Sequence, residues 1–199
     1  MTDAPSETPT PSDTSEPSAP ADATIPAEAP VEDSPPVPEP TPAPSPIAPI
    51  SGIELWIGRS SALPLSHFLE ATGAGHRGLC ITREFPDRLK AYVGTRDVTV
   101  VWLTNVGRGT TVKPTDLPGI VALIGSALAE RQVTALYLEG LEYLVRLHTI
   151  DRIVTVLLEI DASARAHDAR LWIPVHPGLI PSSDLERLRT ELPRTIAVD

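Results

Sequence analysis

Six short apolar segments, separated by stretches of helical periodicity, constrain the fold of this chain more than any other feature of its sequence. Each segment is a continuous apolar run, which is typical of strands that are buried on both faces of a sheet. We expect strands at 53–57, 78–82, 98–103, 134–139 and 170–175, with a weaker candidate at 194–198.

Apolar residues recur three and four positions apart between these runs, as in amphipathic helices. The four stripes are Leu65, Phe68, Leu69 and Thr72 (ending at Gly73); Leu117, Ile120, Val121, Ile124 and Leu128; Ile150, Ile153, Val154 and Leu157; and Leu185, Leu188 and Leu192. We expect Thr115 to start the second helix, with Pro118 in its first turn, and Ser183 with Glu186 to form a capping box for the fourth. Alternating strands and helices predict an α/β fold: a mostly parallel sheet flanked by helices.

The composition changes at residue 50. Residues 1–50 hold fifteen of the 23 prolines and nine of the 26 acidic residues, but no basic or aromatic residue. Such a segment has too little apolar surface to offset the entropy of ordering, so we predict a disordered, proline-rich acidic tail. Residues 51–199 hold all 16 basic residues and 26 − 9 = 17 acidic ones, and they are expected to form a single α/β domain.

This distribution of charge argues against several classes of partner. A nearly neutral domain beside an acidic tail has no basic surface for nucleic acid. No apolar run reaches the ~18–20 residues of a membrane span, and the N-terminus lacks the pattern of a secretory signal. Cys80 is the one cysteine, so neither a disulfide nor a thiolate metal site is expected. We expect a soluble cytoplasmic protein.

The loop after the first expected strand is where a phosphate-binding loop would lie. That motif requires Gly-x-x-x-x-Gly-Lys-Ser/Thr. Counting from Gly58, its last three positions are Leu63, Pro64 and Leu65, so the second glycine, the lysine and the hydroxyl that holds magnesium are absent. Gly58, Ser60 and Ser61 alone match the pattern, and Arg59 is more simply a surface residue. We therefore interpret the loop as a degenerate phosphate loop that serves as a structural turn, and we expect no cofactor.

Several segments resemble an archaeal family, domain of unknown function 835. They are GLCITREFPDRL (78–89), VVWLTN (100–105), KPTDL (113–117), LYLEGLEYLV (136–145) and IPVHPGLIPSSDLERLRTEL (173–192). The resemblance implies an archaeal source and a module attached to signalling or membrane proteins, with no established activity. Glu139 stands where the family is expected to have Asp.

The chain is also similar to circadian-clock and recombinase-type ATPases. The similarity comes from a first strand followed by a lost phosphate loop, and from a later apolar strand that ends in an acidic residue. In those enzymes this acid helps to position magnesium and water, and Glu139 occupies its place here. The likeness implies a RecA-like fold and does not imply activity.

Polar residues gather where the expected strands end, and the carboxyl ends of parallel strands share one edge of the sheet. These residues are Ser60, Ser61, Thr82, Arg83, Glu84, Thr104, Asn105, Glu139, Glu142 and His176. We name Arg83, Asn105 and Glu139 as the candidate ligand cleft. The alternatives are a structural ion pair between Arg83 and Glu139, or plain solvation of the strand ends.

Other residues give no support for catalysis or for a metal site. The five histidines lack metal-ligand spacing, and Cys80 lies within an apolar run. Ser182 and Ser183 are explained by helix capping. The three tryptophans lie in strands, where core packing is expected.

These observations predict a protein that is not an enzyme. The leading hypothesis is a non-catalytic signalling or protein-interaction module with an unidentified protein partner. The alternative is a domain that senses a nucleotide or small metabolite without hydrolysing it. A homo-oligomer is a third possibility.

Overall fold

The computed structural model describes residues 51–107, 109–131 and 133–198. The tail that we predicted at 1–50 to be disordered lies outside these residues. The fold below therefore concerns the part of the chain for which an α/β domain was predicted.

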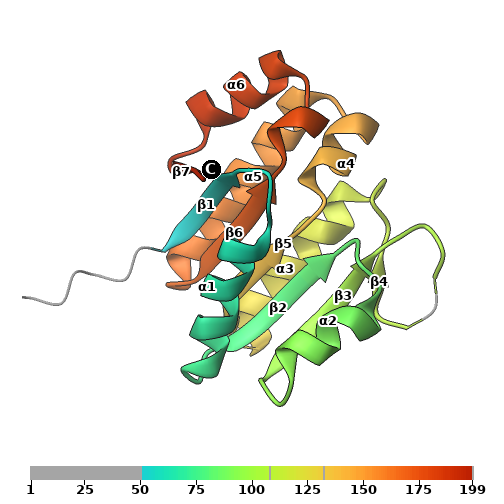
Figure 1. The fold of residues 1–199 in the computed structure, drawn as a ribbon, viewed down its shortest axis with the longest axis vertical. Coiled ribbons are helices and arrows are strands. Elements are labelled where there is room, and N and C mark those ends of the chain that lie inside the picture. The colour runs from blue at the N-terminus through green and yellow to red at the C-terminus, as the bar shows by residue number, and fades with distance from the viewer. Residues whose placement is uncertain (1–50, 108, 132, 199) are drawn as a thin grey trace, which may run out of the picture. The chain divides into compact units, whose positions relative to one another are not determined.

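Seven parallel strands form one sheet in the order β4-β3-β2-β5-β6-β1-β7 (Figure 1). The strands are β1 (Gly52–Ile57), β2 (Arg77–Thr82), β3 (Val98–Leu103), β4 (Thr111–Val112), β5 (Val133–Leu138), β6 (Arg170–Val175) and β7 (Thr195–Ala197). All six segments expected as strands are present, and the predicted α/β class with a parallel sheet is confirmed. The two-residue β4 was not predicted.

Six α-helices and a short 3-10 helix connect the strands. They are α1 (Ala62–Gly73), α2 (Pro86–Val93), α3 (Leu117–Arg131), α4 (Leu141–Leu147), α5 (Ile150–Ala166), η1 (Pro177–Leu179) and α6 (Ser182–Glu191). Buried side chains of α1 and α2 pack on one face of the sheet, and those of α3 to α6 pack on the other. The sequence analysis did not predict α2, α4 or η1.

Burial on both faces explains why the strands read as continuous apolar runs. In β1, Ile53, Leu55 and Ile57 face the core formed with α3 to α6. Trp56 points to the opposite face and joins the core that contains Phe68 of α1. Successive side chains of a strand alternate between faces, so a helix layer on each side demands apolar residues at nearly every position.

The predicted start of α3 is wrong by one residue, and the predicted start of α6 is wrong by two. Asp116, not Thr115, caps α3, because its Oδ1 accepts a hydrogen bond from Gly119 N at 3.0 Å. The capping box at Ser183 is not formed, because α6 already begins at Ser182 and Pro181 occupies the N-cap position. Ser183 lies inside the helix, and its hydroxyl donates to the carboxylate of Asp184 instead. The predicted end of α1 at Gly73 is confirmed.

Candidate functional site

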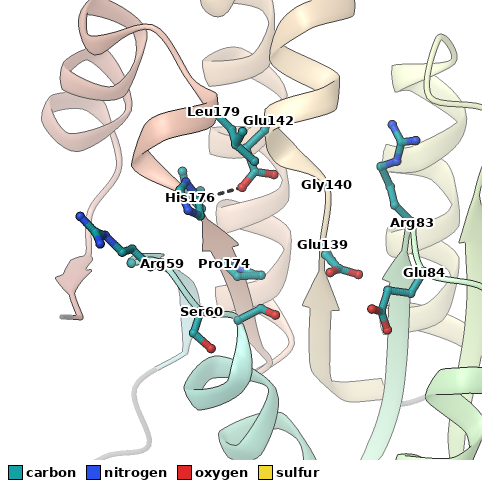
Figure 2. A pocket seen from close by; sticks show the side chains of 13 residues that line it. Arg59, Ser60, Arg83, Glu84, Glu139, Gly140, Glu142, Pro174, His176 and Leu179 are labelled. Carbon is teal, nitrogen blue, oxygen red and sulfur yellow. Dashed lines mark hydrogen bonds between the residues drawn. The ribbon is translucent and has the colours of Figure 1, made fainter.

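A cavity of about 370 Å³ opens at the carboxyl ends of β1, β2, β5 and β6. This is the edge at which open parallel sheets place their ligands. The lining residues are Gly58, Arg59, Ser60, Ser61, Arg83, Glu84, Glu139, Gly140, Glu142, Pro174, Val175, His176 and Leu179 (Figure 2). Most of the polar residues predicted to gather at the strand ends therefore share one cavity.

Two backbone N–H groups of the loop between β1 and α1 are already hydrogen-bonded within the protein. Gly58 N donates to Val175 O at 3.0 Å, and Ala62 N donates to the Ser60 hydroxyl at 3.1 Å. Pro64, the buried third residue of α1, has no N–H to offer. A phosphate is held at such a place by free N–H groups at a helix start. Here Gly58 N and Ala62 N are already hydrogen-bonded, and the N–H at position 64 is missing.

Glu139 follows β5 directly and lies at the floor of the cavity. The hydroxyl of the fully buried Thr82 donates to its carboxylate, and Glu84 N donates to the same hydroxyl at 2.9 Å. Burial raises the pKa of the Glu139 carboxyl above its usual range, and the charges of Glu84 and Glu142 raise it further. The Thr82 hydrogen bond acts in the opposite direction, because it stabilises the ionised form.

Arg83 does not pair with Glu139, so the predicted ion pair between them is wrong. The Arg83 guanidinium lies 3.7 Å from the centre of the Tyr143 ring, and Figure 2 shows it pointing away from the Glu139 carboxylate. The left-handed Gly140 (φ +101°) passes close to the Arg83 side chain. That turn places Tyr143, in the first turn of α4, within reach of Arg83, while Thr82 supplies the hydrogen bond to Glu139.

Asn105 is exposed in the loop after β3 and does not line the cavity. The strand that leads to it, β3, is separated from β5 by β2. Of the three residues proposed for a ligand cleft, the structure therefore brings Arg83 and Glu139 to one cavity and leaves Asn105 outside it.

Glu142 and His176 form the opposite wall. His176 N donates to Glu142 Oε1 at 2.7 Å, and Gly178 N donates to His176 Nδ1 at 3.1 Å. Because a backbone N–H is only a donor, Nδ1 must accept, and a neutral His176 ring carries its proton on Nε2. These contacts tie the start of α4 to the end of β6.

A family model described as "Protein of unknown function (DUF835)" matches residues 64–192. The chain belongs to the DUF835 family. No curated protein matches the sequence. The matched range of this DUF835 domain includes the cavity residues of β2, β5 and β6, whereas Gly58 to Ser61 precede it.

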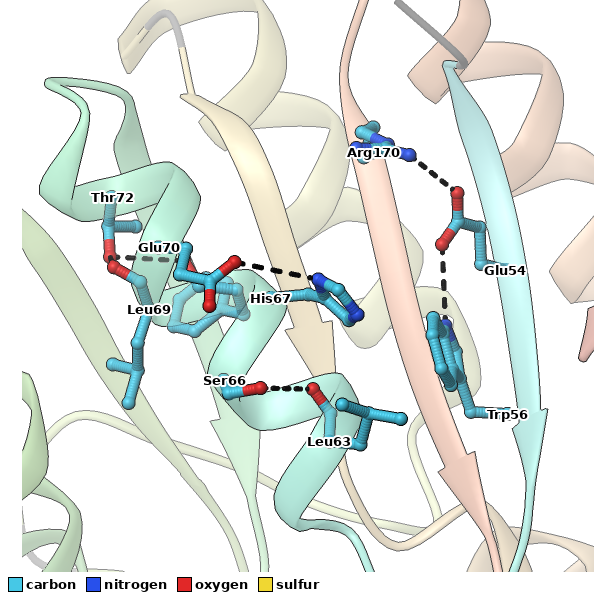
Figure 3. A network of polar contacts seen from close by, with 10 residues as sticks. Glu54, Trp56, Leu63, Ser66, His67, Leu69, Glu70, Thr72 and Arg170 are labelled. Carbon is cyan, nitrogen blue, oxygen red and sulfur yellow. Dashed lines mark hydrogen bonds and ion pairs between the residues drawn. The ribbon is translucent and has the colours of Figure 1, made fainter. Parts of the chain in front are cut away.

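A buried ionic network in the DUF835 domain was missed by the sequence analysis (Figure 3). Glu54 of β1 is 2% exposed. Its carboxylate accepts from Arg170 at 2.9 Å and from Trp56 Nε1 at 3.3 Å, and it lies 3.5 Å from Arg194. The signal was an acidic residue inside the apolar run IELWI. The network links β1 and β6 to the residue preceding β7, away from the cavity.

Two further findings concern chemistry in the described part of the DUF835 domain. Cys80 is fully buried, and burial raises the pKa of its thiol well above its usual range, which keeps it protonated. Within residues 51–107, 109–131 and 133–198, no three His, Cys, Asp or Glu side chains are arranged to hold a metal ion.

No described helix has both the length and the apolar character that a bilayer span requires.

Proposed function

We propose that this DUF835 domain is a non-catalytic interaction module of a signalling or scaffolding protein, with a protein partner. One observation carries the proposal: in the loop after β1, Gly58 N is bonded to Val175 O and Ala62 N to the Ser60 hydroxyl, so these two donors are not free for a phosphate. The cavity beside that loop is lined by three carboxylates as well as by Arg59 and Arg83, and the Arg83 guanidinium lies against the Tyr143 ring. An archaeal source and a cytoplasmic location belong to the same proposal, and they rest on the family resemblance and on the sequence composition.

We further propose that the fold descends from a RecA-like ATPase whose phosphate loop has been lost. The support is positional. β1 leads through a short loop into α1, and Glu139 ends β5, which is separated from β1 only by β6. An acid at that place helps to position magnesium in the ATPases. Here its charge is placed beside Glu84 and Glu142 instead.

The test is to measure nucleotide hydrolysis and thermal unfolding of the full chain with ATP, ADP or GTP and magnesium. A ligand that binds the native state at 100 times its Kd stabilises that state by about 2.7 kcal/mol. We expect neither phosphate release nor a shift in Tm. Hydrolysis that is abolished by Glu139→Gln would refute the proposal.

A second function, the sensing of a small ligand without hydrolysis, is favoured by the cavity itself. Its volume of about 370 Å³ falls within the range of small-molecule sites. Arg83→Ala and Glu139→Ala are expected to weaken such a ligand. Unchanged affinity in both variants would exclude the cavity as the sensing site.

A further inference from the structure

We propose that the cavity at the carboxyl edge of the sheet binds a primary ammonium or guanidinium group. The group is supplied either by a Lys or Arg side chain of the protein partner or by a free amine. The inference rests on the interaction and sensing functions proposed above, and it names the chemistry that they recognise. Four features of the described residues support it: the cavity, its charge, the position of the nearby cations, and its apolar wall.

The cavity is lined by three carboxylates from two sides. Glu84 and Glu139 follow the neighbouring strands β2 and β5, and Glu142 lies in the first turn of α4. Glu139 is already held by the Thr82 hydroxyl and Glu142 by His176 N. Each of these carboxylates has two oxygens and accepts more than one hydrogen bond, so a donor with several N–H groups can be shared among them.

The chain's own cations are held away from these carboxylates. Arg83 lies against the Tyr143 ring at 3.7 Å. Arg59 is exposed on the loop after β1, and Figure 2 shows its guanidinium pointing away from Glu139. The ion pairs of the described residues include none to Glu84, Glu139 or Glu142. Arg59 and Arg83 also line the cavity, so its three carboxylates exceed its two arginines by one formal charge, which an external cation can balance.

The shape and the remaining lining favour an organic cation. A lysine or arginine side chain carries its charge at the end of an apolar stem. Pro174 and the half-exposed Leu179 supply apolar surface along the cavity, and Ser60 and Ser61 supply hydroxyls. A divalent metal is the weaker candidate, because the described carboxylates and histidines are not grouped as metal ligands. An anionic ligand would lie beside Glu84, Glu139 and Glu142, whereas the guanidinium groups of Arg59 and Arg83 point away from Glu139.

Binding of a cation should be linked to the protonation of Glu139. Burial and neighbouring charges raise the pKa of this carboxyl, and a bound ammonium would lower it again. Affinity should therefore increase as the pH rises through the raised pKa, and binding in that range should release protons. A cation attracted only to exposed carboxylates would show its pH dependence at the ordinary pKa of a glutamate.

The experiment is a calorimetric titration of the full chain with three probes at constant ionic strength. The probes are agmatine, Nα-acetyl-lysine methylamide, and the uncharged Nα-acetyl-norleucine methylamide as a neutral control. Each is titrated into the parent protein and into Glu84→Gln, Glu139→Gln and the matched control Glu130→Gln. Glu130 is an exposed residue near the end of α3, outside the cavity. Acidic residues of the segment 1–50 are present in every variant, so binding to them cancels in the comparison.

We expect both cations to bind and the norleucine probe not to bind. Glu139→Gln and Glu84→Gln should each lower the affinity about ten-fold or more, because a charged hydrogen bond is lost, whereas Glu130→Gln should leave it unchanged. Tighter binding of agmatine would assign the site to a free amine. Tighter binding of the lysine probe would assign it to a partner's side chain.

Three results would overturn the inference: no binding of either cation, equal binding of the norleucine probe, or affinities that do not change in the two cavity variants. Urea denaturation of each variant establishes that it is folded. Failure here is separable from failure of the proposed function. If the protein binds neither cation and does not hydrolyse ATP, the proposed cation site is wrong, but the proposal of a non-catalytic module still holds.

Discussion

Replacing Gly140 by alanine tests how the turn after β5 positions Arg83. Gly140 has φ +101° and ψ 24°, a left-handed conformation that costs a residue with a Cβ about 1–2 kcal/mol. A Cβ built there lies 2.7 Å from Arg83 Cγ and 2.9 Å from Arg83 Cδ, so the side chain must move. Moving it off the Tyr143 ring forfeits a cation–π contact of about 0.5–1 kcal/mol. The sum predicts that the free energy of unfolding falls by about 1.5–3 kcal/mol.

The assay is urea denaturation of the full chain, with Gly75→Ala as the matched control. Gly75 has a similar φ of +94°, but a Cβ built on it meets no atom within 4 Å. The control should therefore lose only the backbone term of about 1–2 kcal/mol. In an Arg83→Ala background, where the contact with Tyr143 is already absent, Gly140→Ala should cost only the backbone term. Equal losses for Gly140→Ala and Gly75→Ala, with the same cost of Gly140→Ala in both backgrounds, would refute the argument that Gly140 is required for the placement of Arg83.

Three other substitutions have defined outcomes in denaturation experiments. Asp161→Ala should lower the free energy of unfolding by about 1–3 kcal/mol, because Ile53 N loses the acceptor that it contacts at 2.7 Å; a loss under about 0.5 kcal/mol would contradict this. Asp116→Ala should cost about 1 kcal/mol through the lost cap of α3, and Thr115→Ala should cost nothing measurable. The pKa of Glu139 is raised in the fold, so its stabilising contribution is full below its unfolded pKa and is lost as the pH rises through its folded pKa. Glu139→Gln should remove this pH dependence and have the higher free energy of unfolding at pH 7. If the free energies of unfolding of the variant and of the parent protein change with pH in parallel, this reasoning is wrong.

The sheet was predictable because its strands are buried on both faces and leave an unbroken apolar signal. The elements that were missed lack such a signal. β4 contributes two residues, and α2 buries only Leu89 and Val93. The N-cap of α4 is Gly140, whose left-handed conformation is more typical of the end of a helix than of its beginning. The long helices and strands could thus be predicted from the spacing of their apolar residues, whereas the short elements form because of tertiary contacts that the spacing does not reveal.

The candidate site was predictable in position but not in its pairings. Strand order brings Glu84, Glu139 and His176 to one edge, as parallel strands require. The partner of Arg83 depended on the turn at Gly140, and the partner of Glu139 was a hydroxyl on the adjacent strand. A sequence shows which charges are present, but the choice between two acceptable partners is made by side-chain direction, which is fixed only in the fold.

The position of β1 has a consequence for how the domain is made. Among the residues that the structure describes, β1 is the first strand, yet its two neighbours in the sheet are the last two, β6 and β7. During synthesis the segment IELWI has no partner until residue 170 and beyond have left the ribosome. Since unpaired apolar strands are prone to aggregate, this segment stays exposed to aggregation until β6 has been synthesised. Closure of the sheet around β1 therefore requires residues 170–197.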